Sequence, residues 1–155
     1  MIVRTAWLYS PFGQNLVKTM LRLARDRDAV SVVSDQWGAP TSALELARGL
    51  MAICEAWRDD PALGLGGTYH FAGSGETNWA GLARAVFAAS AEAGGPVAVV
   101  TDIATADWPA KAKRPSNSRL CPDLFAMTFG CRAPDWRQSV SSTTVRIVKE
   151  RAFQA

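Results

Sequence analysis

The spacing of apolar positions changes several times along the chain, and each change predicts a switch between strand and helix. Residues 2–9 are rich in β-branched and aromatic side chains and end at a Ser-Pro-Phe-Gly turn, so they predict a strand. Leu16, Met20 and Leu23 then recur at the spacing of one helix face, behind Asn15 as a suitable N-cap. Residues 30–34 return to a short apolar strand.

The remainder of the chain continues this alternation. Ser42 and Glu45 fit a capping box at the start of a second helix. Further strands are predicted at 68–72 and 97–100, with a helix capped by Thr77 between them, an irregular loop over 101–119 and a short helix over 123–127. The predicted inward-facing residues are, helix by helix, Leu46, Leu50, Ile53 and Trp57; Trp79, Leu82 and Val86; and, after Pro134-Asp135, Trp136, Val140, Thr144 and Ile147. This order predicts an α/β fold.

Composition limits the class of protein without indicating a function. The 155 residues are 48% hydrophobic and 20% charged, with a net charge of +3, as in one soluble globular domain. The basic residues are spread from Arg4 to Arg151, so we expect no nucleic-acid partner. Cys54, Cys121 and Cys131 lack metal-ligand spacing. With no long apolar run and no leader pattern at the first residues, we expect a cytoplasmic protein without membrane contact.

A glycine-rich turn and a single histidine are the first candidates for chemistry. Gly73-Ser74-Gly75 follows a predicted strand and opens a helix, as in a dinucleotide-binding unit, but the third glycine of that pattern is missing. Both nucleotide binding and an ordinary turn remain open. His70 lies in a predicted strand with no Ser or Cys nucleophile motif around it, so we interpret it as a packed residue rather than a general base.

Several segments together resemble a known family. They are residues 3–9 (VRTAWLY), 13–20 (GQNLVKTM), 35–41 (DQWGAPT) and 114–120 (RPSNSRL), supported by 67–71 (GTYHF) and 134–136 (PDW). Their order and spacing resemble dTDP-4-dehydrorhamnose reductase over essentially the whole chain. The resemblance implies the C-terminal portion of an NAD(P)-binding, Rossmann-type extended short-chain dehydrogenase/reductase, with the last sheet strands plus the substrate-binding domain.

In that family NADPH reduces the C4 ketone of dTDP-4-dehydro-L-rhamnose to give dTDP-L-rhamnose for polysaccharides. The resemblance implies that a GxxGxxG loop and a YxxxK pair in the N-terminal half hold the cofactor and handle the proton. Here Tyr9 and Tyr69 are each followed four residues later by glycine instead of lysine. We therefore expect a truncated chain in which residues 1–155 form a single substrate-binding part, inactive and without NADPH when alone.

The resemblance also implies substrate-binding positions. Trp7 matches a tryptophan beside the sugar, where an aromatic face packs on a pyranose, and a role in the core is the alternative. Asn15 donates to the ligand or caps its helix, and both interpretations remain open. Gln36 lies at a strand end that faces the same cleft, or serves the structure alone.

A second group of implied positions lies in the Arg-Pro-Ser-Asn-Ser segment. Arg114, Asn117 and Ser118 offer several donors to phosphate oxygens or to the nucleotide. A loop held by its own polar groups is the alternative. Some family members dimerise through magnesium, and Glu150 matches one of the acids involved, but Leu44 stands where another is expected. We therefore carry no metal over.

The expected partners are a dTDP-sugar and a protein that covers the sheet edge at residues 2–9. Parallel strands are buried on both faces in such sheets, so this edge favours a separately encoded N-terminal half or self-association. Two other functions remain open. One is a stand-alone dTDP-sugar binding or interaction module without catalysis, and the other is a nucleotide site at residues 73–102 of an independent protein.

Overall fold

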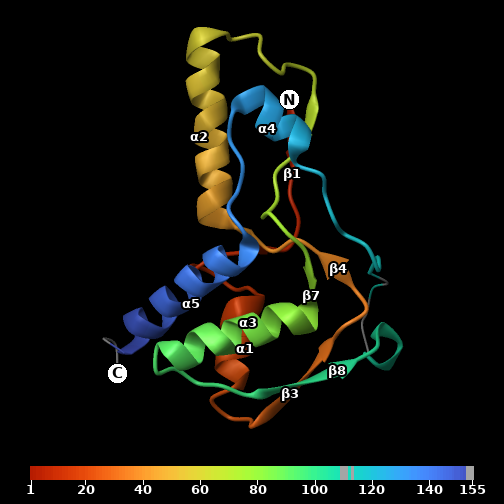
Figure 1. Cartoon of the computed structure of the whole chain (residues 1–155), viewed down its shortest axis with the longest axis vertical. Helices are drawn as coiled ribbons and strands as arrows, with labels where there is room; N and C mark the ends of the chain where they lie inside the picture. Colours follow the sequence, from red (N-terminus) through yellow and green to blue (C-terminus); the bar gives the residue numbers. More distant parts are fainter. Residues whose placement is uncertain (109–111, 113, 153–155) are drawn as a thin grey trace.

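The computed structural model describes residues 1–108, 112 and 114–152. Parts of the predicted loop 101–119, including Pro109, lie outside the described residues. Helices and strands alternate along the chain, as the sequence predicts (Figure 1). They are β1 (Ile2–Arg4), β2 (Leu8–Tyr9), α1 (Leu16–Leu23), β3 (Ala29–Val33), β4 (Trp37–Gly38), β5 (Thr41–Ser42), α2 (Ala43–Asp59), β6 (Thr68–His70), β7 (Thr77–Asn78), α3 (Trp79–Glu92), β8 (Val99–Ile103), the 3-10 helix η1 (Thr105–Asp107), α4 (Asp123–Phe129) and α5 (Trp136–Ala152).

Strand pairing joins segments that are distant in the sequence. Within the described ranges the strands form pairs: β1 with β6, β2 with β5 and β3 with β8 run parallel, whereas β4 and β7 are antiparallel. The β3–β8 pair has the longest register, with Ala29 opposite Val99 and Val33 opposite Ile103. Parallel pairs connected through helices confirm the predicted α/β class.

The prediction of one continuous strand over residues 2–9 is wrong. The strand breaks after Arg4, and Trp7 adopts a φ of 51°, in the left-handed region that side chains with a Cβ rarely occupy. Leu8 and Tyr9 then pair with a different strand, β5. The break turns the chain from one sheet pair into another and places Trp7 at the bend.

Two hydrophobic clusters hold the elements together. The larger cluster joins α1, α3 and α5 to β3 and includes Val17, Val86 and Val140, which have no measurable exposure. The second cluster lies at the other end of the molecule, where α2 and α4 cover β6, and is built from edge-on contacts among Phe71, Phe125 and neighbouring aromatic rings. Figure 1 shows α2, α4 and β1 gathered at the top, away from α1, α3 and α5.

Most predicted helix faces are confirmed, with three corrections at the helix starts and on α2. Asn78 rather than Thr77 caps α3, because its Oδ1 accepts from the N–H of Gly81 at 2.7 Å. Ser42 caps α2 by accepting from Leu44, but Glu45 pairs with Arg48 instead of completing a capping box. The third correction concerns Leu50, which was predicted to be buried and is 45% exposed.

The β1–β6 pair has an open edge. Among the described strands β1 pairs with β6 alone, and Ile2 and Leu8 on this N-terminal segment are 57% and 48% exposed. On α2, Leu44, Leu50 and Met51 are also exposed. Another protein segment could bury these exposed apolar side chains.

Candidate functional site

An open cleft of about 690 Å³ lies between α1, β3 and the start of α3. Its apolar wall comes from Leu16, Met20 and Leu23 on one side of α1, together with Val32 and Val33 of β3. The i, i+4, i+7 spacing of the α1 residues, recognised in the sequence, is what places them in one row. The cleft is therefore lined largely by regular structure rather than by loops.

Polar and aromatic side chains form the opposite rim of this cleft. Gln36, Trp79 and Thr105 line it together with Trp108 and Arg114. Gln36 and Arg114, both predicted substrate-binding residues, thus border the same cavity. The guanidinium of an arginine offers several donors in a plane, which suits phosphate oxygens.

A chain of hydrogen bonds fixes the polar rim. The indole Nε1–H of Trp79 donates to Oε1 of Gln36 at 3.0 Å, and Nε2 of Gln36 donates to Oγ1 of Thr105 at 3.0 Å. The N–H of Thr105 and its hydroxyl both donate to Asp35. These bonds from Thr105 hold the pKa of the Asp35 carboxyl below its ordinary value. Gln36 is buried. Its Oε1 and its Nε2 each hold a neighbouring side chain in position, that of Trp79 and that of Thr105.

Trp7 lies behind this rim. Its ring stacks on Trp79 with centroids 3.5 Å apart and planes inclined by 9°. A Cβ added to Gly38 would overlap the indole of Trp7, so Gly38 lies against the ring on the side that Trp79 leaves open. The positive φ of Trp7 at the bend between β1 and β2 brings the indole into this position.

The other predicted positions are occupied by local contacts. Oδ1 of Asn15 accepts from the N–H of Lys18 at 3.2 Å, and its Nδ2 donates to the carbonyl of Ser10 at 2.7 Å, as the helix-cap interpretation predicts. Oδ1 of Asn117 accepts from the backbone N–H and the Nε of Arg119.

The backbone of the Asn117 segment also pairs with β4. The N–H of Ser118 donates to the carbonyl of Trp37 at 2.8 Å, and the N–H of Trp37 donates to Ser116. The loop therefore lies beside Gln36, and Oδ1 of Asn117 is engaged within its own segment. Of the predicted residues, the structure brings Gln36 and Arg114 to the cleft and places Trp7, Asn15, Asn117 and Ser118 around it.

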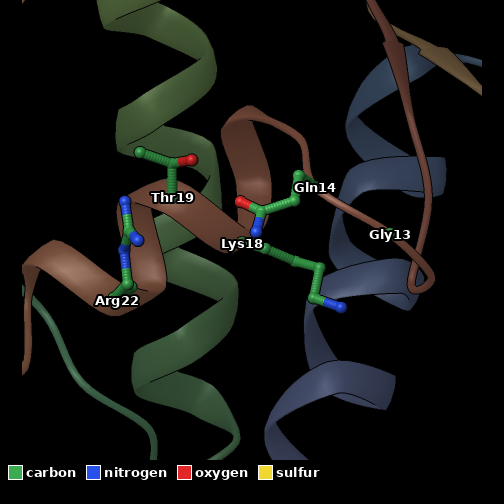
Figure 2. Close-up of a pocket in the computed structure, with 5 residues that line it drawn as sticks. All are labelled: Gly13, Gln14, Lys18, Thr19 and Arg22. Carbon is green, nitrogen blue, oxygen red and sulfur yellow. The ribbon is translucent and has the colours of Figure 1, made fainter.

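A second, smaller pocket of about 210 Å³ lies on the outer side of α1 (Figure 2). Gly13, Gln14, Lys18, Thr19 and Arg22 line it. Figure 2 shows the Lys18 and Arg22 side chains extending in different directions from the helix. Nζ of Lys18 donates to the carbonyl of Pro11 at 3.1 Å. The ammonium of Lys18 and the guanidinium of Arg22 therefore do not point to a common position in the pocket.

The glycine turn at residues 73–75 does not fit a cofactor pyrophosphate. The N–H of Gly73 donates to Oγ1 of Thr41, and a Cβ at Gly73 would collide with the carbonyl of Pro40. Gly75 has a φ of 83° and packs against Trp136. The glycines are required for close packing and a left-handed turn, which supports the ordinary-turn interpretation.

The described side chains and helices also bear on metal binding and on membrane insertion. Among the residues that the structure describes, no three His, Cys, Asp or Glu side chains gather to hold a metal ion. Glu150 instead accepts from Arg146 on the same helix. Across the same ranges, none of the helices has the length and apolar character needed to span a bilayer.

Sequence reasoning missed part of the site. Trp79 was assigned to the core and Thr105 to an irregular loop, yet both line the cleft. The family resemblance includes Asp35, which anchors Thr105, only as the first residue of the segment 35–41. A possible signal was the position of Asp35 and Gln36 directly after a strand, because the carboxyl ends of parallel strands collect binding residues.

The parallel strands, the intervening helices and a cleft at their ends define the class of this chain. It has the fold of the C-terminal, substrate-binding portion of NAD(P)-dependent extended short-chain dehydrogenases/reductases. The family model described as "RmlD substrate binding domain" matches residues 1–148, and the chain belongs to this family.

Named relatives agree with this assignment. The chain is 45% identical over 138 residues to a dTDP-4-dehydrorhamnose reductase of Sinorhizobium fredii, covering 89% of this chain and 47% of the relative. A crystal structure of a dTDP-4-dehydrorhamnose reductase from Clostridium acetobutylicum superposes with a TM-score of 0.80 at 32% identity, covering 99% of this chain and 49% of that one. The Bacillus anthracis enzyme, solved in complex with NADP, gives a TM-score of 0.79 at 31% identity, covering 94% and 48%. The chain spans about half the length of the curated relatives it matches.

Proposed function

We propose that residues 1–155 act as the sugar-nucleotide-binding half of a dTDP-4-dehydrorhamnose reductase. In this proposal the cleft holds the dTDP-sugar, and NADPH supplies the hydride from a second, cofactor-binding half. The observation that carries it is the cleft of about 690 Å³ in a chain that is 45% identical to such a reductase. The chain alone then binds substrate and does not catalyse reduction, because the family's YxxxK pair does not occur among its 155 residues.

The chemistry of the cleft supports a nucleotide ligand. Arg114 at the rim provides charge for a diphosphate, whereas Met20 and Val32 offer apolar surface for a ring. Asn117 and Ser118 lie next to the rim and are proposed to contact the nucleotide through groups that the loop leaves accessible. Trp7 and Asn15 are proposed to shape the site in the chain alone. They are proposed to contact the sugar directly only when the cofactor-binding half is also present.

The open edge described above supports a protein partner. A cofactor-binding half would extend the β1–β6 pair and bury Ile2 and other exposed apolar side chains of the N-terminal segment. We propose this partner ahead of self-association, because the solved relatives carry roughly the same length of chain beyond the part that matches.

Isothermal titration calorimetry of the 155-residue chain with dTDP tests the binding function, with UDP as the matched control. We expect saturable binding of dTDP, weaker binding of UDP and no oxidation of NADPH in the presence of the dTDP-4-keto sugar. A cofactor-binding half supplied as a second polypeptide should restore NADPH oxidation. Failure of dTDP to bind would refute the proposal, and reduction by the isolated chain would refute the division of labour.

The same titration addresses the alternative of a stand-alone binding module. If dTDP binds but no cofactor-binding half associates with the chain in sedimentation experiments, the binding-module interpretation becomes the better one. Self-association through the same edge would appear there as a dimer, which Ile2→Lys should disrupt because it places a charge on the exposed edge.

A further inference from the structure

The two stacked tryptophans beside the cleft have different surroundings. Trp7 is enclosed between the ring of Trp79 and the backbone of Gly38. Trp79 lines the cleft and is half-buried. The face of Trp79 that Trp7 does not cover is therefore an aromatic surface available to a ligand, and the exposed indole of Trp108 lines the same cleft without a stacking partner among the aromatic pairs that the structure describes. Figure 1 shows α3, which begins at Trp79, beside the β3–β8 pair, and β3 supplies Val32 and Val33 to the cleft wall.

The ring of Trp79 is held on two sides. Stacking on Trp7 fixes its plane, and the bond from Nε1 to Gln36 fixes its rotation. Gln36 is in turn oriented by Thr105, which is anchored by Asp35. A side chain restrained in this way loses little conformational freedom when a ligand binds, which favours affinity.

The chemistry of the cleft favours a flat, apolar ring against Trp79. Met20, Leu23 and Val32 line the same cavity and offer no hydrogen bonds. One lone pair of Gln36 Oε1 and one N–H of its Nε2 are already used by Trp79 and Thr105, so Gln36 has fewer groups to offer the hydroxyl groups of a pyranose. A planar base with a methyl group, as in thymine, satisfies these conditions better than a sugar does.

We propose that Trp79 supplies the aromatic face on which the thymine base of the ligand stacks, and that Gln36, Thr105 and Asp35 are positioning residues that hold its indole. This inference rests on the proposed function and names the group that recognises the base. Trp7 supports the stack from behind. Stacking of a base on an aromatic side chain typically changes affinity by about 5- to 150-fold.

Fluorine NMR of the full chain labelled with 5-fluorotryptophan tests the contact without a disruptive substitution. Trp79→Phe assigns the resonance of Trp79, and Trp57, in the second hydrophobic cluster, is the internal control. We expect dTDP to shift the Trp79 resonance and leave that of Trp57 in place. Inorganic pyrophosphate, which lacks the base, should leave both unchanged. Binding of dTDP with an unmoved Trp79 resonance overturns the inference.

Binding measurements on variants separate the roles. Trp79→Leu should weaken dTDP binding by roughly tenfold, whereas Trp79→Phe should stay within about threefold because it keeps an aromatic face. The matched control Trp57→Phe should bind as the original chain does. If the original chain binds no dTDP, the proposed function fails. If it binds and Trp79→Leu folds and binds equally well, only the present inference fails.

The positioning role of Thr105 has its own readout. Thr105→Val removes the hydroxyl between Gln36 and Asp35, so the near-ultraviolet circular dichroism of the stacked indoles should change and dTDP binding should weaken several-fold. Thr105→Ser keeps the hydroxyl and should rescue both. An unchanged dichroism spectrum with unchanged binding in Thr105→Val would show that the bonds do not position Trp79.

Discussion

Replacing Gln36 by leucine and Trp79 by phenylalanine, singly and together, measures the hydrogen bond between these side chains. The bond from the indole Nε1–H to the amide Oε1 is 3.0 Å long, and Gln36 is only 7% exposed. Gln36→Leu also breaks the bond to Thr105. Gln36→Leu therefore removes two hydrogen bonds, and Trp79→Phe removes one.

The structure sets the size of the expected effects. A typical hydrogen bond contributes about 0.5–1.5 kcal/mol to the free energy of unfolding, so Gln36→Leu should cost about 1–3 kcal/mol. The Trp79→Phe variant loses one bond and part of a ring that stacks on Trp7. The two substitutions share one hydrogen bond, between Trp79 and Gln36, so their coupling energy should be about 1 kcal/mol. Water in the open cleft replaces part of that bond in the variants and keeps the coupling energy from being larger.

Urea unfolding followed by far-ultraviolet circular dichroism gives the four free energies of the cycle. The matched control cycle combines Gln36→Leu with Trp57→Phe, since Trp57 donates to Leu63 in the other cluster. The control should be additive. A coupling below about 0.3 kcal/mol in the Gln36–Trp79 cycle, no larger than ordinary additivity error, would refute the account of a fixed indole.

Three further predictions concern stability. Phe125→Ala should lower the free energy of unfolding by about 3–5 kcal/mol because the ring is 1% exposed, whereas Phe12→Ala, at an exposed ring, should change it by less than about 0.5 kcal/mol in the same urea assay. Asn78→Ala should cost about 1 kcal/mol through loss of the α3 cap, seen as a lower midpoint in thermal unfolding; an unchanged midpoint would contradict the cap. The pKa of Asp35 is lowered in the folded chain. Its ionised carboxylate therefore adds to the free energy of unfolding at a pH above its ordinary pKa, and this contribution is lost as the pH falls through the lower pKa of the folded state. Asp35→Asn should therefore be less stable than the original chain at pH 7, with a difference that shrinks steadily below about pH 4.

Helix positions and faces could be predicted because they depend on local spacing. Trp136, Val140 and Ile147 recur with the helical period and are buried in α5. The same reasoning failed for Leu50, because the period gives the direction of a face and not its width. How far α2 is covered depends on the segments packed against it.

The polar rim of the cleft could not be read from local patterns. Gln36 and Thr105 are separated by 69 positions, and their bond depends on β3 and β8 lying in register. The bend at Trp7 escaped prediction for a related reason, since a residue with high strand propensity takes a positive φ only where tertiary packing requires it. The family resemblance implied substrate-binding roles for Gln36 and Arg114, which both line the cleft, but it did not point to the indole of Trp79 that lines it with them.

The long-range strand pairs constrain how the chain acquires its structure during synthesis. Ile2 pairs with Thr68, and Ala29 pairs with Val99. At roughly 5–20 residues per second on the ribosome, each first strand emerges several seconds before its partner exists. Such non-local contacts slow folding and leave apolar strands exposed to other chains during that interval. The supply of chaperones and the temperature of expression should therefore influence the yield of this protein. Their effect on the yield should be stronger than the effect of the stability of the folded core.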